Sequence, residues 1–503
     1  MINIDDTITA ISTPPGQGGI GVIRISGPDS WKIGRQVFVP GNGKEPQDRY
    51  MTYGHIVDRD SAAADGEEGS QQKPKVIDEV MCVFLKGPRT YTTEDMVEID
   101  CHGGTVPLRR TLELILRAGA RPADRGEFTK RAFLGGRIDL SQAEAVMDLI
   151  SAKADRTFDV AMEQLEGSES AAVGQIRDHF VDILVNLTVN IDYPDEDIEV
   201  MTYEKLEQEL MDVREEIDEL RDSAETGRIL RDGLRVAIVG KPNVGKSSLM
   251  NAMLRESRAI VTDIPGTTRD TIEESMSIRG IPVVLTDTAG IRETTDQIEA
   301  MGIQRSRASF NQADLVIIMI DGSRELSEED IEILGAASAP RTLILINKGD
   351  LAHVTEVSDV RQHLPETEKD GVEILCTSLA EGSGDRSAVE EAIIRRVMGP
   401  SEDGSTGSFT SDESISDGAK TGSTLGISGA PDRVLVTDAR HKALLDRASQ
   451  SVSDALKLVQ IREPLEIIEI DVNSAYENLG EITGESATED ILDEVFKRFC
   501  LGK

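Results

Sequence analysis

The segment LRVAIVGKPNVGKSSLMNAML, residues 234–254, determines the fold of the middle of this chain. An apolar strand pattern, Val236–Val239, leads into the loop Gly240–Ser247, and a helical pattern follows the loop. The spacing Gly-x-x-x-x-Gly-Lys-Ser is that of a phosphate-binding loop, whose glycines let backbone amides turn toward phosphates, and the following helix N-terminus favours an anion. Strand and helix patterns then alternate to about residue 398. The sequence therefore predicts a nucleotide-binding α/β domain.

Three further motifs follow the loop in order: GTTRD at 266–270, DTAG at 287–290 and NKGD at 347–350. The Asp350 carboxylate can accept two parallel hydrogen bonds from the N1–H and amino groups of guanine, which adenine cannot supply in that arrangement. The segment 378–380, Ser-Leu-Ala, follows the predicted strand EILC and is a candidate for the loop behind the guanine. The set of motifs predicts a GTPase of the switch type.

The chemistry of phosphate transfer assigns roles within these motifs. Lys246 would supply charge to the β- and γ-phosphates, and the Ser247 hydroxyl suits Mg²⁺. Asp287 would hold Mg²⁺ through water, and Thr267 and Thr268 would form a switch.

One expected part is missing, because Ile291 stands where Ras-like enzymes carry a water-orienting glutamine. An aliphatic side chain cannot orient water. Two residues suggest substitutes: Asn243 could coordinate a monovalent cation beside the phosphates, and Glu299 could place the water. Each also has a plain structural reading, Asn243 as a turn residue and Glu299 as a surface carboxylate.

Periodicity and composition divide the chain into five parts. Residues 1–120 show short strand patterns typical of an α+β domain, and residues 121–231 are helical. The α/β domain spans 232–398, a Gly/Ser/Asp-rich linker or insertion 399–432, and a second helical part 433–503. We expect one helical domain, split in sequence, with the α/β domain inserted. Its long first helix carries an apolar seam at Leu206, Leu210, Val213, Ile217 and Leu220.

The net charge of −38 argues against a large non-specific nucleic-acid surface, so any nucleic-acid role would need a local basic patch or a basic partner. Four scattered cysteines form neither a disulfide framework nor a metal-binding spacing, which fits a reducing cytoplasm. No signal peptide and no apolar run of about 18 residues is found, so we expect a cytoplasmic protein without a membrane span.

The chain ends in FCLGK, which has the outline of a prenylation box at Cys500–Lys503. Gly502 and Lys503 do not fit such a box, and no polybasic run precedes it. We expect a packed final helix, with a capping box formed by Ser486 and Glu489, that places Cys500 at a defined position. Its apolar stripe is Ile491, Leu492, Val495, Phe496 and Phe499.

Three further segments join the GTPase motifs and FCLGK in one set: DTITAISTPPGQGGIGVIRISG, YTTEDMVEIDCHGG and GEFTKRAFLGGRIDLSQAEAVMDLI. On this set, nearly the whole chain resembles the MnmE (TrmE) family of bacterial tRNA-modification GTPases. It implies an N-terminal folate-binding and dimerisation domain, a split helical domain and an inserted Ras-like G domain. The sequence departs from the family at Thr93, where glycine is usual, and at Gly135, where asparagine is usual.

The resemblance also implies cofactors and site residues. Thr268 would join Ser247 on Mg²⁺, K⁺ would be held by Asn243, Thr262, Ile264 and Thr267, and Glu299 would orient water. A 5-formyltetrahydrofolate or 5,10-methylenetetrahydrofolate cofactor would contact Arg24, Glu98, Arg137 and Lys503. Cys500 is a candidate catalytic thiol, with a structural or folate-contacting thiol as alternatives. The candidate GTP-binding residues are Asn243, Val244, Gly245, Lys246, Ser247, Ser248, Thr262, Asp263, Ile264, Pro265, Gly266, Thr267, Thr268, Asp287, Thr288, Ala289, Gly290, Asn347, Lys348, Gly349, Asp350, Ser378, Leu379 and Ala380.

The implied reaction needs a partner. A homodimer would act with the FAD-dependent protein MnmG, as a heterotetramer, to add an aminomethyl or carboxymethylaminomethyl group to C5 of the wobble uridine of certain tRNAs. Two other functions compete: an RNA-binding regulatory or ribosome-assembly GTPase, and a folate-binding module with a degenerate G domain. The N-terminal segment GIGVIRIS and the tail argue against the first, and Lys246, Ser247, Asp287 and Asp350 against the second.

Overall fold

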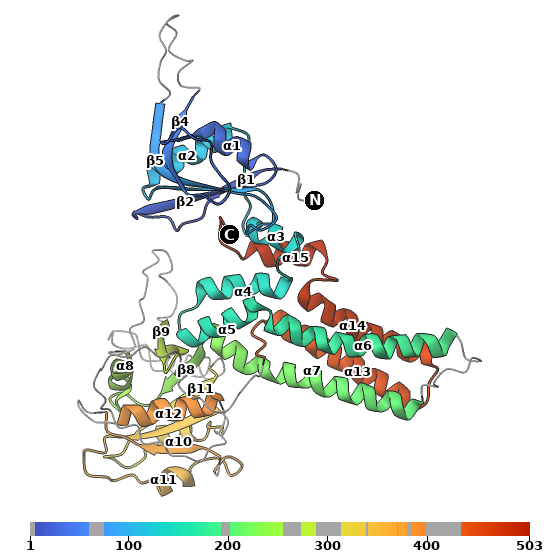
Figure 1. The fold of residues 1–503 in the computed structure, drawn as a ribbon. Coiled ribbons are helices and arrows are strands. Elements are labelled where there is room, and N and C mark those ends of the chain that lie inside the picture. Colours follow the sequence, from blue (N-terminus) through green and yellow to red (C-terminus); the bar gives the residue numbers. More distant parts are fainter. Residues whose placement is uncertain are drawn as a thin grey trace, which may run out of the picture. The chain divides into compact units, whose positions relative to one another are not determined.

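The computed structural model describes residues 6–59, 75–192, 202–254, 273–287, 313–338, 341–369, 371–379, 385–398 and 434–503. Two compact units divide the chain (Figure 1). Unit 1 comprises Met1–Met147, Gln164–Asp178 and Tyr476–Lys503. Unit 2 comprises Asp148–Glu163 and His179–Ala475. The first and last segments of the chain therefore belong to one unit. The predicted linker, 399–432, lies outside the described residues.

Unit 1 contains a seven-stranded sheet of order β3-β4-β5-β6-β2-β1-β7, in which only the β1–β7 pair is parallel. Two helices, α1 (Ser30–Val37) and α2 (Thr105–Arg117), contact each other and pack on one face of this sheet. The strands are β1 (Ile8–Ile11), β2 (Ile20–Ser26), β3 (Phe38–Pro40), β4 (Thr52–Asp58), β5 (Lys75–Leu85), β6 (Met96–His102) and β7 (Arg121–Pro122).

Alternation along β2 separates the two faces of this sheet. Ile23 and Ile25 are buried in the core under the helices, so Arg24 between them points to the opposite face. Cys82 and Cys101 lie in the same core. Burial raises the pKa of Cys82 and raises that of Cys101 to about 12, so neither thiol is a nucleophile at neutral pH.

The last helix, α15 (Glu489–Lys497), packs in unit 1 against α3 (Glu127–Leu134), and its Leu492, Val495 and Phe496 lie in one buried cluster with Phe499. The predicted apolar stripe is confirmed. The predicted capping box is wrong: Thr488 is the N-cap and makes no side-chain cap. Ser486 instead donates to the carbonyl of Glu477, because the tight turn after α14 brings that acceptor closer.

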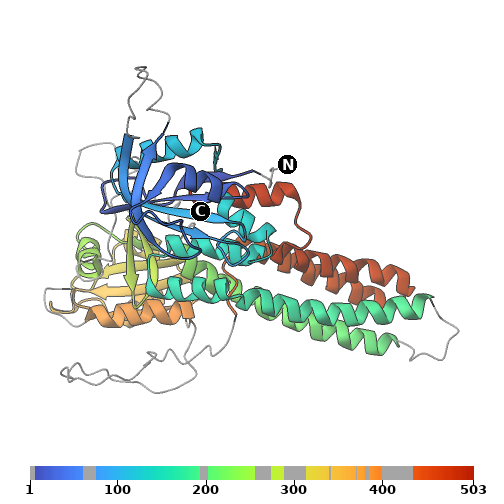
Figure 2. The ribbon, with the colours of Figure 1, turned by 45° about the horizontal axis from the view of Figure 1, so that its top comes forward.

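The remaining helices outside the nucleotide domain are α4 (Leu140–Ser151), α5 (Asp155–Glu166), α6 (Ser168–Asp192), α7 (Tyr203–Asp232), α13 (Ala439–Gln460) and α14 (Leu465–Thr483). In unit 2, α7 and α13 run side by side (Figures 1 and 2). All five residues of the predicted α7 seam are buried, which confirms that a helix partner covers that face.

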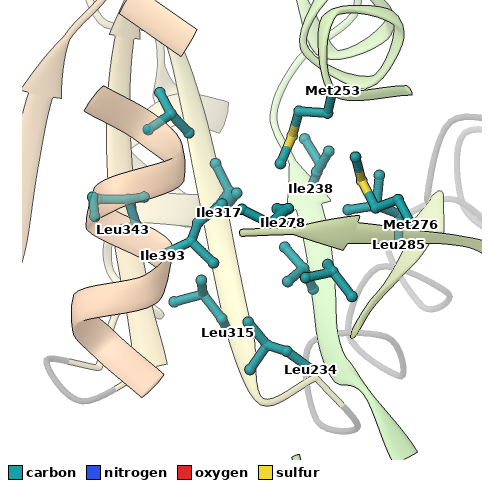
Figure 3. Packing of buried hydrophobic residues seen from close by; sticks show 14 of the residues in the cluster. Leu234, Ile238, Met253, Met276, Ile278, Leu285, Leu315, Ile317, Leu343 and Ile393 are labelled. Atoms are coloured by element: carbon teal, nitrogen blue, oxygen red, sulfur yellow. The ribbon is translucent and has the colours of Figure 1, made fainter. Parts of the chain in front are cut away.

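The nucleotide domain is a six-stranded sheet of order β13-β12-β11-β8-β10-β9, parallel except for the β9–β10 pair. Helix α12 packs on one face, where Ile393 lies among Leu234, Ile317 and Leu343 from three strands (Figure 3). The elements are β8 (Leu234–Val239), α8 (Lys246–Leu254), β9 (Glu273–Ile278), β10 (Ile281–Asp287), β11 (Leu315–Asp321), α10 (Glu328–Leu334), β12 (Thr342–Asn347), α11 (Val357–Gln362), β13 (Glu373–Cys376) and α12 (Asp385–Met398).

The described parts thus have the α+β, helical and α/β character that the sequence predicts. In the described part of the chain, no helix combines the length and apolar character needed to cross a membrane.

Candidate functional site

The phosphate-loop sequence forms a tight turn between β8 and α8. Gly240 and Gly245 have φ of +153° and +111°, and Asn243 has φ of +63°. A Cβ atom at Gly245 would lie 2.2 Å from Nδ2 of Asn347, so the loop tolerates only glycine there. Lys246 Nζ donates to the carbonyl oxygens of Gly240 at 2.5 Å and Lys241 at 2.7 Å. The loop thus holds its own lysine in place.

Asn347 joins the phosphate loop to the two segments predicted to bind guanine. Its Nδ2 donates to the Val244 carbonyl at 2.8 Å, and its Oδ1 accepts from the Leu379 amide at 3.2 Å. The side chain lies in the buried interior of the domain. The end of β12, the loop after β13 and the phosphate loop therefore meet at one edge of the sheet.

Asp350 and Ser378 lie together at this edge. Ser378 Oγ donates to Asp350 Oδ1 at 3.0 Å, and the Ser378 amide donates to Asp385 Oδ2 at 2.6 Å. The Gly349 amide donates to the Thr377 carbonyl at 3.0 Å. This geometry holds the Asp350 carboxylate beside the loop that the sequence assigned to guanine.

Asp321 is a site residue that the sequence analysis missed. It ends β11, and its carboxylate accepts a hydrogen bond from Lys348 Nζ at 2.6 Å. This bond fixes the NKGD loop, in which Lys348 takes the unfavourable left-handed φ of +69°. Burial opposes the Asp321 charge, but hydrogen bonds from Lys348 and Ser323 hold its pKa below the usual value. The available signal was the single acidic residue at the end of the apolar run LVIIMID.

Asn243, Ser247 and Ser248 are exposed on the loop and α8. Asp287 ends β10 opposite Ile238 in the register with β8, so its backbone lies at the edge that bears the loop. The other predicted nucleotide and cation residues lie outside the described residues: Thr262, Asp263, Ile264, Pro265, Gly266, Thr267, Thr268, Thr288, Ala289, Gly290, Glu299 and Ala380.

A second cluster lies in unit 1, on the face of the sheet opposite α1 and α2. Arg24 and Glu98 are direct partners in the β2–β6 register, and Arg24 Nε donates to Glu98 Oε1 at 2.7 Å. Arg24 Nη1 is buried and has no hydrogen-bond partner among the described residues. An inward-facing guanidinium nitrogen without an acceptor suits an anionic or carbonyl group of a ligand.

Tyr91 connects this pair to Arg137 and was also missed as a site residue. The guanidinium carbons of Arg24 and Arg137 lie 5.4 and 4.6 Å from the centre of its ring. Arg137 Nε donates to the Tyr91 carbonyl at 2.7 Å, and the Tyr91 hydroxyl hydrogen-bonds Thr129 at 2.9 Å. The signal was the aromatic residue that opens the quoted segment YTTEDMVEIDCHGG.

A buried ionic network holds the segment that carries Tyr91. Arg131, 1% exposed, donates to Glu94 at 2.9 Å, to Asp6 at 2.6 Å and to Glu127 at 3.0 Å. Burial opposes the charge of Glu127, yet hydrogen bonds from Arg121, the Asp124 amide and Arg131 keep its pKa below the usual value.

The C-terminal tail reaches the same cluster. Burial, and then the charge of Arg24, lower the pKa of Lys503, whereas Cys500 and Glu98 act in the opposite direction. The Cys500 carbonyl accepts from the Gly126 amide at 3.4 Å, and the Cys500 side chain is exposed. Arg24, Glu98 and Lys503, which lie far apart in sequence, therefore gather in one place, with Arg137 joined through Tyr91.

Comparisons with known proteins cover both clusters. The model of the TrmE N-terminus family, described as a GTP-binding protein, matches residues 7–137, and the MnmE helical domain model matches residues 140–500. Proteins described as tRNA modification GTPase MnmE are 48% identical in Alkaliphilus metalliredigens and 43% identical in Bacillus subtilis. Each match covers 99% of this chain and 100% of the relative.

Among solved structures, the G domain of the T. maritima FeoB iron transporter is 26% identical, with a TM-score of 0.24 over 32% of this chain and 98% of that one. The chain belongs to the MnmE family of tRNA modification GTPases, because a family model matches most of it and relatives align along its whole length.

Proposed function

We propose that this chain is a K⁺-dependent GTP hydrolase that works with an FAD-dependent MnmG partner on tRNA. Together they would attach an aminomethyl or carboxymethylaminomethyl group to C5 of the wobble uridine, with a folate one-carbon unit. The proposal rests on the full-length membership of the family. It is supported by the edge of the sheet at which Asn347 joins the phosphate loop to the NKGD segment, which we call the nucleotide edge.

The nucleotide edge supplies the residues for GTP. Lys246 would exchange its two loop carbonyl acceptors for phosphate oxygens, and Ser247 and Thr268 would hold Mg²⁺. Asp350 would accept from guanine. Mg²⁺, when bound, neutralises charge that develops on the phosphates. Glu299 would orient water in place of the missing glutamine.

Asn243 suits a cation ligand, because it is exposed on the phosphate loop and its amide oxygen is a ligand that K⁺ accepts. Thr262, Ile264 and Thr267 would complete the K⁺ site. A cation there supplies positive charge beside the phosphates, which Ras-like enzymes obtain from an arginine.

The unit 1 cluster fits a tetrahydrofolate. Glu98 would accept from the amino edge of the pterin, and Arg137 and Lys503 would bind glutamyl carboxylates. The buried Arg24 Nη1, which has no hydrogen-bond partner within the described ranges, is the structural feature that favours a ligand here. Bound folate would supply the one-carbon unit, and Cys500, three residues before Lys503, would be the candidate thiol.

GTP hydrolysis would drive or gate domain motion rather than supply the carbon chemistry. The working form would be a cytoplasmic homodimer that joins MnmG in a heterotetramer. Full-length similarity to MnmE proteins, which includes the N-terminal and helical parts, favours this function over a general RNA-binding switch.

The test is GTP turnover in KCl and in NaCl at equal ionic strength, with Asn243→Ala, Glu299→Ala and, as a matched carboxylate control, Glu293→Ala. We expect strong K⁺ dependence that Asn243→Ala abolishes, almost no turnover by Glu299→Ala, and ordinary turnover by the control. Equal, slow turnover in both salts would overturn the cation mechanism. A complete assay with the partner, folate and tRNA then tests the modification.

A further inference from the structure

The negative charge of this chain is unevenly distributed. Residues 1–147 hold 18 Lys and Arg against 21 Asp and Glu, whereas the whole chain holds 54 against 92. Almost all of the excess acid therefore lies in residues 148–503. Phosphate-rich RNA would be repelled by most of the chain and tolerated by the first part.

Within that first part, six exposed cations come from three segments, and we call them the basic edge. The segments are α1, the stretch between β3 and β4, and the start of the loop between β5 and β6. The basic edge consists of Lys32, Arg35, Lys44, Arg49, Lys86 and Arg89.

Contacts between the three segments hold the basic edge together. Trp31 Nε1 donates to the Leu85 carbonyl at 3.1 Å, which ties α1 to the end of β5. Arg35 lies over the Trp31 ring at 5.5 Å and pairs with Glu45 at 3.5 Å. The edge is therefore a continuous surface of unit 1.

Arg49 anchors the loop that follows β5. Its backbone takes the left-handed φ of +59°, and its Nη2 donates to the carbonyls of Lys86 at 3.1 Å and Arg89 at 2.6 Å. One guanidinium group thus holds the loop from which Lys86 and Arg89 project into solvent. Two residues further along the chain is Tyr91, beside Arg24 and Arg137.

Carboxylates offset three of the six cations of the basic edge and leave the other three. Asp29, Glu45 and Asp48 pair with Lys32, Arg35 and Arg49 respectively, at 3.5 to 3.7 Å. Asp95 is occupied by the Gly87 amide. Lys44, Lys86 and Arg89 take part in none of the ion pairs among the described residues. Tyr50, which follows Arg49 in the chain, is 61% exposed, and its ring is an aromatic surface suited to stacking on a base.

We propose that the basic edge binds the sugar–phosphate backbone of tRNA. The inference rests on the proposed function, and it locates where that substrate is held. Three cations that have no carboxylate partner in the described part of the chain, an exposed tyrosine and a loop that leads to Tyr91 favour RNA over an acidic protein.

The test measures tRNA affinity of the full-length chain by fluorescence anisotropy over a range of KCl concentrations. The variant is Lys86→Gln/Arg89→Gln, since neither side chain supports the fold through a described contact. The matched control is Arg109→Gln/Arg110→Gln, which removes two exposed cations from α2 in the same unit. Tyr50→Leu probes stacking, and the fluorescence of Trp31, the single tryptophan, checks that unit 1 is folded in each variant.

We expect Lys86→Gln/Arg89→Gln to weaken tRNA binding about tenfold or more at low salt, and to reduce the slope of log affinity against log salt by about 1 per phosphate contact. The control should bind like the unsubstituted chain. Equal losses in both double variants would mean that only net charge matters and would overturn the proposal. Unchanged tRNA binding in Lys86→Gln/Arg89→Gln would also overturn the proposal. If that variant bound tRNA normally but lost self-association, the basic edge would instead be a contact for an acidic protein surface. Absence of tRNA binding by the unsubstituted chain, with and without the partner, would instead count against the proposed function as well.

Discussion

Ser12 donates a hydrogen bond from its Oγ to the backbone carbonyl of Gly502 at 3.1 Å, which joins two residues 490 positions apart. Gly502 has φ of +87°, and a Cβ atom there would lie 2.4 Å from the carbonyl oxygen of Ile11. The end of β1 and the C-terminal tail are thus in direct backbone contact. The tail is a fixed part of unit 1, and this contact places Lys503 near Arg24.

Gly502→Ala should displace the tail, because alanine meets both a strained φ and the Ile11 carbonyl. We expect the dissociation constant for 5-formyltetrahydrofolate to rise about tenfold, equivalent to ~1.4 kcal/mol. Ser12→Ala, which removes one partly buried hydrogen bond and adds no clash, should have a smaller effect. Isothermal titration would measure both, and normal GTP turnover would show that unit 2 is unaffected. Unchanged folate affinity in Gly502→Ala would separate the tail from the ligand site.

Tyr91→Leu should weaken folate binding by about tenfold, since cation–π contacts contribute roughly 0.5–2 kcal/mol and here orient two arginines. Tyr91→Phe keeps the ring and loses only the hydroxyl contact to Thr129, so it should bind nearly as the unsubstituted chain does. Trp31, the single tryptophan, reports the unfolding of unit 1 by fluorescence. Equal weakening in both variants would contradict the role of the ring.

As the pH rises, folate affinity should begin to fall at a lower pH than it would if Lys503 had the pKa of an ordinary lysine. The pKa of Lys503 is lowered from 10.5, chiefly by burial, so its ammonium charge is present below that lowered pKa and is lost as pH rises through it. An anionic ligand loses attraction over the same range. Lys503→Arg keeps its charge and should give a flatter profile. Titrations from neutral pH upward would show this, and parallel profiles would rule out Lys503 as the titrating group.

Thr93 and Gly135 form a compensating pair near the same cluster. A Cβ atom at Gly135 would lie 2.2 Å from Thr93 Oγ1, and Thr93 has φ of +69°. Gly135→Ala should therefore destabilise unit 1 by about 1–3 kcal/mol, as overpacking does. Thr93→Gly should relieve that loss when the two changes are combined. Urea unfolding followed through Trp31 measures the coupling, and additive effects would exclude the clash.

Asn347→Ala should lower guanine-nucleotide affinity by about 1–3 kcal/mol, because Val244 O and the Leu379 amide lose their shared partner in a buried place. Asn347→Asp keeps the acceptor for the Leu379 amide, so its nucleotide affinity should lie between those of the unsubstituted chain and Asn347→Ala. Titration with a fluorescent GDP analogue measures the effect, with folate affinity as the internal control. Full affinity in Asn347→Ala would mean that the loop is held by other contacts.

The sequence alone predicted the strand–loop–helix arrangement of the phosphate loop and the strand that ends at the NKGD segment, because each motif stands at a fixed place relative to an apolar strand pattern. The spacing of apolar residues likewise predicted the buried seam of α7, outside this domain. The sequence marks Asp321 as the acidic end of an apolar strand, but its pairing with Lys348 was not predictable, because a strand pattern does not show which side chain of another segment faces it. The last helix was predicted with the right stripe and the wrong cap, because Ser486 found an acceptor in Glu477.

The tertiary structure alone decided the unit 1 cluster. Arg24, Glu98 and Lys503 have no periodicity in common, and only the resemblance to a family indicated them in advance. The β2–β6 register sets Arg24 against Glu98, and the Ser12–Gly502 contact brings in the tail. The local pattern of apolar residues predicts which face of a strand or helix is buried. It does not predict which distant strand will pair with a given strand, since that pairing depends on the packing of the whole unit.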